Sequence, residues 1–279
     1  MERRRRRESR SEPSLAEQYY DDPEAYIREK LGWTPWKGTP AMPGQVEVIQ
    51  AYRLAIRQQL ERRAFQRGEL DEGELRYWTP GDVIKYRIRV EAGHTVGKTK
   101  LASGLVSHFS DCFAPSIGYT FAPTAEQINK LLWKEIRSDR RGKALPGRVY
   151  DGKPELVRGP EHFVVGRATS DARGTGTERV QGQHQKYLIF VIDEAEGVAD
   201  YVWDSIESME SGGIVIVLAL ANPRTRTSKF HKLKGLSTTR SFRISCLGHP
   251  NVLTGGEVID GAVRREWVEG MVEKHCEVV

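Results

Sequence analysis

The chain has 279 residues, of which 29% are charged and 38% are hydrophobic. This length allows one substantial hydrophobic core with appendages, which excludes a peptide hormone or a small disulfide-stapled domain. No stretch approaches the roughly 20 consecutive apolar residues that a membrane-spanning helix needs, so we expect no membrane partner. The three cysteines are an odd number without CxxC spacing, which argues against a disulfide framework or a zinc site.

Positive charge is concentrated at the start of the chain. Lys and Arg total 43 against 38 Asp and Glu, a net charge of +5. Residues 1–13 hold six arginines and three glutamates, so the rest of the chain is close to neutral. Because these residues show no apolar periodicity, we expect a basic disordered arm. Such an arm either binds nucleic acid or is a solvated tail, and the sequence leaves both readings open.

The pattern along the chain changes near residue 83. Residues 14–82 are mostly helical in pattern, interrupted by a proline-broken aromatic turn at 33–36. After them, short strands alternate with helices. We expect strands at 84–91, 116–122, 187–192 and 214–221, helices at 100–109, after Pro123 and at 200–209, and a hairpin of 155–158 with 162–166. The uninterrupted apolar runs at 187–192 and 214–221 are typical of parallel strands buried on both faces, which predicts an α/β fold with a mostly parallel sheet flanked by helices.

The loop after the first expected strand carries a phosphate-binding pattern. It follows GxxxxGK(S/T) with alanine in the first glycine position, and its residues are Ala92, Gly93, His94, Thr95, Val96, Gly97, Lys98 and Thr99. Backbone N–H groups of such a loop wrap a phosphate at a helix N-terminus, while the lysine reaches the β and γ phosphates and the hydroxyl binds Mg²⁺. The strand before it and the amphipathic helix after it favour a nucleotide site over a simple turn.

Two further segments end buried strands with polar side chains. Asp193 and Glu194 follow the run at 187–192, where one acid can hold Mg²⁺ through water and the other can polarise an attacking water. The second acid favours an ATPase over a signalling GTPase. Asn222 follows the run at 214–221 and could hydrogen-bond the water or the γ-phosphate, although an Asn-Pro pair is also an ordinary turn.

Five segments in this order resemble the large terminase subunit of tailed bacteriophages, the motor that packs double-stranded DNA into procapsids. They are residues 92–99, 119–136, 180–209, 218–232 and 247–252, and the similarity covers roughly residues 33–252. Five collinear motifs are far more specific than one pair of nucleotide-binding motifs. The resemblance implies a P-loop NTPase fold of the additional-strand, catalytic-glutamate (RecA-like) type with a helical N-terminal lid region.

The resemblance also implies roles for single residues. Lys98 and Thr99 would be the phosphate and Mg²⁺ ligands, Asp193 the second metal-binding acid, and Glu194 the catalytic carboxylate. Asn222 would lie in the motif that couples hydrolysis to motion. The adenine-binding glutamine of the family would be Gln45, with Trp36 as a candidate aromatic wall, although Gln50 lies nearby and the tryptophans can be core residues.

One departure from the family concerns the cation that neutralises the transition state. Many relatives carry an arginine inside the P-loop, where this chain has His94. Arginine fingers are worth orders of magnitude in rate, so another arginine must act, in cis or from a neighbouring subunit. We select Arg173 and Arg179, which lie in a glycine-rich stretch before the run at 187–192. The other candidates are Arg140, Arg141 and Arg224.

The implied partners are ATP and Mg²⁺, double-stranded DNA, the procapsid portal and the small terminase subunit. The family assembles a homo-oligomeric ring, and a monomer is compatible with an isolated domain; the expected location is the host bacterial cytoplasm, docked on the portal. Fewer than 30 residues follow Asn251, too few for the nuclease domain of the family. We expect an excised ATPase domain, with a packaging ATPase whose nuclease lies elsewhere as the alternative.

These expectations divide the chain into a basic arm (1–13), a helical lid and adenine-binding region (14–82), an ATPase core (83–247) and the start of a linker (248–279). Two other functions remain open. A helicase or remodelling translocase would need a second α/β domain, and Glu196 stands where such enzymes carry His or Asp. A nucleotide-dependent DNA-binding assembly module with little hydrolysis would rely on the arm.

Overall fold

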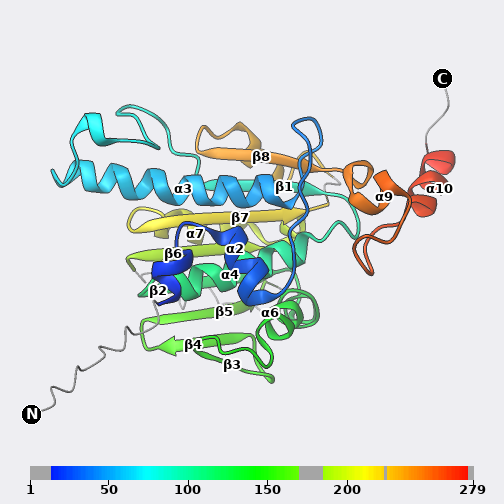
Figure 1. Ribbon diagram of the computed structural model, residues 1–279, viewed down its shortest axis with the longest axis horizontal. Helices are drawn as coiled ribbons and strands as arrows, with labels where there is room; N and C mark the ends of the chain where they lie inside the picture. Colours follow the sequence, from blue (N-terminus) through cyan, green and yellow to red (C-terminus); the bar gives the residue numbers. More distant parts are fainter. Residues whose placement is uncertain (1–13, 170–184, 223–224, 276–279) are drawn as a thin grey trace, which may run out of the picture.

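A computed structural model describes residues 14–169, 185–222 and 225–275 of the chain. Its centre is an eight-stranded sheet in the order β3-β4-β5-β2-β6-β7-β1-β8 (Figure 1). From β5 to β8 in this order, neighbouring strands pair in parallel, while the β3–β4 and β4–β5 pairs are antiparallel. The expected fold class is confirmed. The strands are β1 (Arg87–Ala92), β2 (Ser116–Ala122), β3 (Arg148–Val149), β4 (Glu155–Gly159), β5 (His162–Ala168), β6 (Tyr187–Ile192), β7 (Ile214–Ala221) and β8 (Thr239–Ile244).

Helices cover both faces of this sheet. The α-helices are α1 (Leu15–Tyr19), α2 (Pro23–Tyr26), α3 (Gln45–Gln66), α4 (Lys98–Cys112), α5 (Ala125–Gln127), α6 (Trp133–Arg140), α7 (Asp200–Met209), α8 (Lys229–Lys232), α9 (Pro250–Thr254) and α10 (Arg265–His275). The π-helical turns are η1 (Ile27–Leu31) and η3 (Ile128–Leu132), and the 3-10 turns are η2 (Glu72–Glu74), η4 (Ala195–Gly197), η5 (Leu233–Gly235) and η6 (Cys246–Gly248). None of the helices in the described ranges is long and apolar enough to cross a membrane.

Two apolar layers hold these helices to the sheet. On one face, α2, α3 and α4 pack against Ile88, Val90 and Leu218 of the central strands. On the other face, α7 and α8 pack against Val217 and Ala219, which alternate with the first set along the same strands. This alternation follows from the two-residue period of a strand, which sends successive side chains to opposite faces. The central strands are therefore buried on both sides.

The buried strands lie where their apolar runs predict. The strands at 116–122, 187–192 and 214–221, the helix at 200–209 and the hairpin of β4 with β5 are confirmed. The helix expected at 100–109 is longer, from Lys98 to Cys112. The strand β8 and the helix α9 were not expected. The helical region that begins at residue 15 packs into the same apolar layer as the sheet, while its proposed division from the core as a separate lid stays a prediction.

The first strand begins three residues later than its apolar alternation predicts. The first residue of β1, Arg87, pairs with Val217, so Val215 lies before the start of β1 and has no ladder partner on that side. The Gln59 side chain on α3 fills this place: its amide donates to the Val215 carbonyl at 2.8 Å and its oxygen accepts the Val215 N–H at 2.9 Å. A buried backbone needs such partners, and Gln59 replaces a strand residue in this role.

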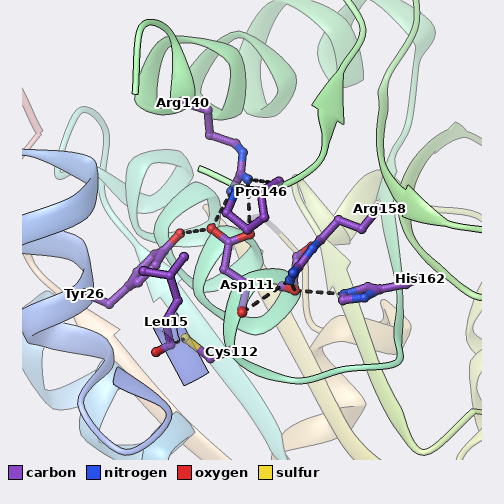
Figure 2. Close-up of polar contacts among 9 residues, drawn as sticks. Leu15, Tyr26, Asp111, Cys112, Arg140, Pro146, Arg158 and His162 are labelled. Carbon is purple, nitrogen blue, oxygen red and sulfur yellow. Dashed lines mark hydrogen bonds and ion pairs between the residues drawn. The ribbon is translucent and has the colours of Figure 1, made fainter. Parts of the chain in front are cut away.

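Polar side chains at the end of α4 tie the N-terminal helices to the sheet. Asp111 accepts hydrogen bonds from Tyr26 on α2 at 2.5 Å and from both terminal nitrogens of Arg140 on α6 at 3.0 and 3.1 Å (Figure 2). Arg158 and His162, from β4 and β5, contact the last carbonyls of α4 at Ser110. Cations and donors at a helix C-terminus satisfy carbonyls that have no partner within the helix.

A buried histidine on α4 makes a second connection. The Nε2 of His108 lies 2.9 Å from the Tyr19 carbonyl on α1, and its Nδ1 lies 2.8 Å from the Tyr52 hydroxyl on α3. Burial lowers the pKa of His108 to about 4, so the ring is neutral near pH 7. In that state Nε2–H donates to the carbonyl and Nδ1 accepts the hydroxyl proton. This single ring therefore joins three helices.

The buried Asp111–Arg140 pair generates a stability prediction. Both side chains are almost completely buried, so Arg140→Met leaves a buried carboxylate without its cation. We expect the free energy of unfolding to fall by about 3–5 kcal/mol, measured by urea denaturation. The matched control is Arg28→Met, which breaks an exposed pair with Glu29 and should leave the free energy of unfolding almost unchanged. Equal losses in the two variants would contradict the role of this pair.

Candidate nucleotide-binding site

The phosphate-binding pattern forms a loop between β1 and α4. Ala92 is the buried last residue of β1, where it pairs with Ile244 of β8, and α4 begins at Lys98. Gly97 adopts a left-handed backbone with φ of 84°, and a Cβ at this position would lie 2.6 Å from the Gln45 amide nitrogen. Glycine is therefore required at Gly97 on two independent grounds.

The carbonyl groups of this loop face outward and its N–H groups do not. The carbonyls of Thr95, Val96 and Gly97 accept hydrogen bonds from the Val263 N–H at 3.2 Å, the Trp36 indole at 3.2 Å and the Gln45 amide at 2.9 Å. Within the described ranges, the N–H groups of residues 94–97 have no hydrogen-bond partner. A loop with its carbonyls bound on the outside and its N–H groups free forms a concavity suited to an anion.

Two acidic side chains lie beside this loop at the end of β6. The Thr99 hydroxyl donates to Oδ2 of Asp193 at 3.3 Å, and Nζ of Lys98 lies 2.7 Å from Oε1 of Glu194. Because β6 is parallel to β1 with only β7 between them, both strands bring their carboxyl ends to the same edge of the sheet. The structure thus brings together the four residues that the two motifs predicted.

Burial raises the pKa of Asp193 to about 6 from its usual value near 4, and the neighbouring Glu194 charge adds to the rise. Lys98 and the hydrogen bonds from the Glu194 N–H and Thr99 oppose it. A buried carboxylate beside a second carboxylate is costly when ionised, and a cation relieves that cost. The arrangement therefore favours a bound cation next to Asp193.

Glu194 has an unusual backbone conformation. Its φ of 48° and ψ of 45° lie in the left-handed region, which is uncommon for a residue with a Cβ and costs about 1 kcal/mol or more. This turn directs the chain away from β6 and holds the Glu194 side chain against Lys98. Strain of this kind persists only where surrounding structure imposes it, and it concentrates at functional positions.

The third predicted segment also reaches the loop. The Asn222 amide nitrogen lies 2.8 Å from Nε2 of His94, so the residue after β7 contacts the phosphate loop. Because the amide nitrogen can only donate, Nε2 of His94 accepts. The structure places Asn222 in contact with the loop, and its role in coupling hydrolysis to motion stays a prediction.

The two residues predicted to bind adenine, Gln45 and Trp36, both donate hydrogen bonds to the phosphate loop. Gln45 donates to the Gly97 carbonyl and accepts the Trp36 backbone N–H at 3.2 Å, and both side chains are buried. The Trp36 ring packs edge-on against His249 at 5.2 Å between centroids. In this structure they brace the loop; whether they also contact adenine stays a prediction.

A cleft of about 800 Å³ opens beside the loop. Residues of the phosphate loop line part of it, and other lining residues are ones to which the sequence assigned no role, among them Trp33, Leu131, Lys134, Pro250, Val258 and Ile259. The last three come from the segment expected to begin a linker, which instead folds back over the loop, with Trp267 of α10 contacting the His94 ring at 6.3 Å between centroids. No local periodicity signals that return.

The arginines proposed as fingers divide into three groups. Arg173, Arg179 and Arg224 lie outside the described residues, so their role stays a prediction. Arg140 is held by Asp111 and the Pro146 carbonyl, at the opposite end of α4 from the loop, and is not placed to act on a phosphate in this chain. Arg141 is exposed just after α6.

The fold is that of phage large terminases. The large terminase of bacteriophage HK97 aligns with a TM-score of 0.56 over 94% of this chain and 52% of its own, at 11% identity, and it carries the assignment of the fold. The large terminase ATPase domain of Thermus phage P74-26 aligns with a TM-score of 0.44, with 16% identity over 60% of this chain and 81% of its own. The large terminase of a further thermophilic bacteriophage, in complex with ADP, aligns at 0.49, with 16% identity over 70% of this chain and 46% of its own.

Sequence comparison adds no relative. No protein-family model matches the chain, and no curated protein matches it. The chain spans about half of the length of the HK97 terminase.

The raised pKa of Asp193 gives a pH-dependent prediction for the metal-free protein. Since the folded state binds a proton between about pH 4 and pH 6 that the unfolded state has lost, stability should fall as pH rises through this window. Asp193→Asn removes this titration and should raise the free energy of unfolding at pH 7 by up to about 3 kcal/mol, with no gain below pH 4. Denaturation with EDTA at several pH values measures it.

The control is Asp200→Asn, which changes an exposed acid at the start of α7 and should leave the pH profile unchanged. A metal-free Asp193→Asn variant that is less stable than the original chain at pH 7 would contradict the origin assigned to the raised pKa.

Proposed function

We propose that the chain is the ATPase motor domain of a viral DNA-packaging terminase, which hydrolyses Mg-ATP to move double-stranded DNA into a procapsid. One observation carries the proposal: two complementary pairs, Lys98 with Glu194 and Thr99 with Asp193, meet at one edge of the sheet beside a loop with free N–H groups. The terminase fold supports it.

The residues fit a magnesium nucleotide. The free N–H groups of residues 94–97 would bind phosphate oxygens, and the cleft has room for the nucleoside. The Thr99 hydroxyl and the buried Asp193 carboxylate are oxygen donors of the kind that Mg²⁺ prefers, and a cation there offsets the cost that raises the pKa of Asp193. Bound Mg²⁺ would neutralise the negative charge that develops on the phosphate oxygens in the transition state.

The ion pair between Lys98 and Glu194 is the arrangement of the site without nucleotide. Lys98 and Glu194 neutralise each other across 2.7 Å. When phosphates enter the loop, Lys98 exchanges the carboxylate for phosphate oxygens, which frees Glu194 to accept a hydrogen bond from the attacking water and to polarise it. Asn222, through His94, then responds to the loss of the γ-phosphate. The arginine that completes the site is Arg173 or Arg179, acting in cis or from a neighbouring subunit.

The wider assembly follows from the same proposal. The chain works as a homo-oligomeric ring on the procapsid portal in the host cytoplasm, with the small terminase subunit as a further partner. Motors of this kind grip the phosphate backbone rather than base edges, so DNA binding depends on salt and little on sequence.

Glu194→Gln tests the catalytic carboxylate. The amide cannot act as a base, so phosphate release from ATP should fall about 100-fold or more while the affinity for ATP is retained. The control is Glu207→Gln, on the exposed side of α7, which should leave both quantities unchanged. Unchanged turnover in Glu194→Gln would contradict the assignment, and negligible turnover in the unsubstituted chain with duplex DNA present would favour the assembly module.

Lys98→Ala tests phosphate binding. Loss of a charge-assisted contact should weaken ATP binding about 10-fold or more, measured by isothermal titration calorimetry. Lys85→Ala, at an exposed position before β1, is the matched control and should bind as the original chain does. An Lys98→Ala variant with unaltered affinity would place the phosphates elsewhere.

A further inference from the structure

One segment of the chain carries positive charge without any acid. Between Glu210 and Glu257 there is no Asp or Glu, while seven Lys and Arg residues occur: Arg224, Arg226, Lys229, Lys232, Lys234, Arg240 and Arg243. The segment begins with β7, contains α8, η5 and the edge strand β8, and ends beyond η6. Figure 1 shows β8 at one edge of the sheet. The body of the protein is nearly neutral as a whole, so this stretch concentrates its excess charge in one region.

A groove of about 660 Å³ lies in this region, and we call it the basic groove. Its ionisable lining consists of Arg89, Glu91, Arg226, His231, Lys234 and Arg243. These residues come from β1, from the loop after β7, from α8 and η5, and from β8. Four lysine and arginine side chains therefore face a single carboxylate.

That carboxylate is already neutralised. Glu91 accepts a hydrogen bond from Arg89 at 2.6 Å, and Arg89 is 1% exposed, with its Nε donating to the Phe230 carbonyl at 2.8 Å and its guanidinium 4.3 Å from the Phe230 ring centroid. Arg89 and Glu91 therefore neutralise each other at the base of the groove. Arg243 approaches Glu91 only to 3.7 Å and keeps 82% of its side chain exposed.

The remaining cations are available to a ligand. Arg226 and Lys234 are exposed and form no ion pair with any carboxylate in the described ranges, and Arg243 adds a third exposed charge. Exposed Lys232 and Arg240 continue the positive surface beyond the groove. An open row of cations from several elements suits a ligand with many spaced phosphates better than a single small anion.

A residue that lines the groove, Thr225, is hydrogen-bonded to the segment that carries the candidate catalytic acid. The Thr225 N–H and hydroxyl both donate to Oε1 of Glu196, at 2.6 and 3.0 Å. Glu196 lies two residues after Glu194, and Asn222, three residues before Thr225, contacts His94 in the phosphate loop. Asn222 therefore contacts the phosphate loop, and Thr225, which lines the groove, contacts Glu196 after β6.

We propose that the basic groove binds the phosphate backbone of double-stranded DNA, through Arg226, Lys234 and Arg243. The proposal rests on the proposed DNA-motor function and names the surface that grips the duplex. Flexible cations without a fixed bidentate partner contact phosphates rather than base edges, so binding is insensitive to sequence. The bonds through Thr225 and Asn222 connect the grip on the duplex to the nucleotide site.

The test uses the full chain with Arg3, Arg4, Arg5, Arg6 and Arg7 replaced by serine, so that the arm supplies no binding of its own. In this background Arg226→Gln, Lys234→Gln and Arg243→Gln are combined. Affinity for a fluorescent 30-base-pair duplex is measured by anisotropy over a range of salt concentrations. Each lost phosphate contact should reduce the slope of log K against log salt by about 0.9, so we expect a reduction of about 2–3 and binding at least about 10-fold weaker at low salt.

The matched control combines Arg67→Gln, Arg76→Gln and Lys153→Gln, which remove the same charge from exposed positions outside the groove. It should retain the original slope. ATP turnover without DNA should be the same in both triple variants, while stimulation of turnover by duplex DNA should be lost only in the groove variant.

The possible failures are distinct. If the background chain hydrolyses ATP and binds duplex, but the groove variant keeps the same affinity and slope, the groove is overturned and the motor function stands. Tight binding of inorganic phosphate without duplex binding would identify a small-anion site and overturn the proposal. If the background chain neither hydrolyses ATP nor binds duplex, the motor function and the groove fall together.

Discussion

Parallel pairing at the centre of the sheet is the constraint on which the rest of the structure depends. Because β6, β7 and β1 run in the same direction, their carboxyl ends meet at one edge, and the residues that follow them converge there. Asp193, Asn222 and the phosphate loop are separated by up to about 130 residues of chain, yet each follows one of three adjacent strands. Apolar layers on both faces bury these strands, and this packing fixes the position of the edge. Preorganisation of this kind positions charged groups before any ligand arrives.

The electrostatics of this edge are balanced internally at some cost. Two adjacent carboxylates, one of them buried, face one lysine and one hydroxyl, and burial keeps the pKa of Asp193 high. The left-handed backbone at Glu194 adds strain. The electrostatic cost at Asp193 is of the type that a bound cation would relieve, since the cation pairs with the buried carboxylate. The buried carboxylate that is costly in the ligand-free site is therefore the group that would hold the metal in the proposed mechanism.

Segments from both ends of the described chain complete the phosphate loop. Gln45 and Trp36 reach it from before the first strand, and Val263 reaches it from after the last. Each satisfies one outward carbonyl, so the N–H groups of the loop remain free to face the cleft. The contact of Asn222 with His94 and of Thr225 with Glu196 joins the same edge to the basic groove. The candidate nucleotide site and the basic groove are thus connected by hydrogen bonds and are not independent surfaces.

Local sequence determined the elements whose signal is local. The strands β2, β6 and β7 and the helix α7 follow from uninterrupted apolar runs or helical spacing, and Lys98, Thr99, Asp193 and Glu194 follow from their positions after such runs. The edge strand β8 escaped prediction because its charged, half-exposed sequence lacks an apolar run. Only the tertiary structure decided that Gln59 ends the ladder of β1, that Gln45 and Trp36 brace the phosphate loop, and that the segment after residue 249 lines the cleft. These are contacts between residues tens to hundreds of positions apart, and local periodicity carries no record of them, because it reports which side of an element is buried and not what buries it.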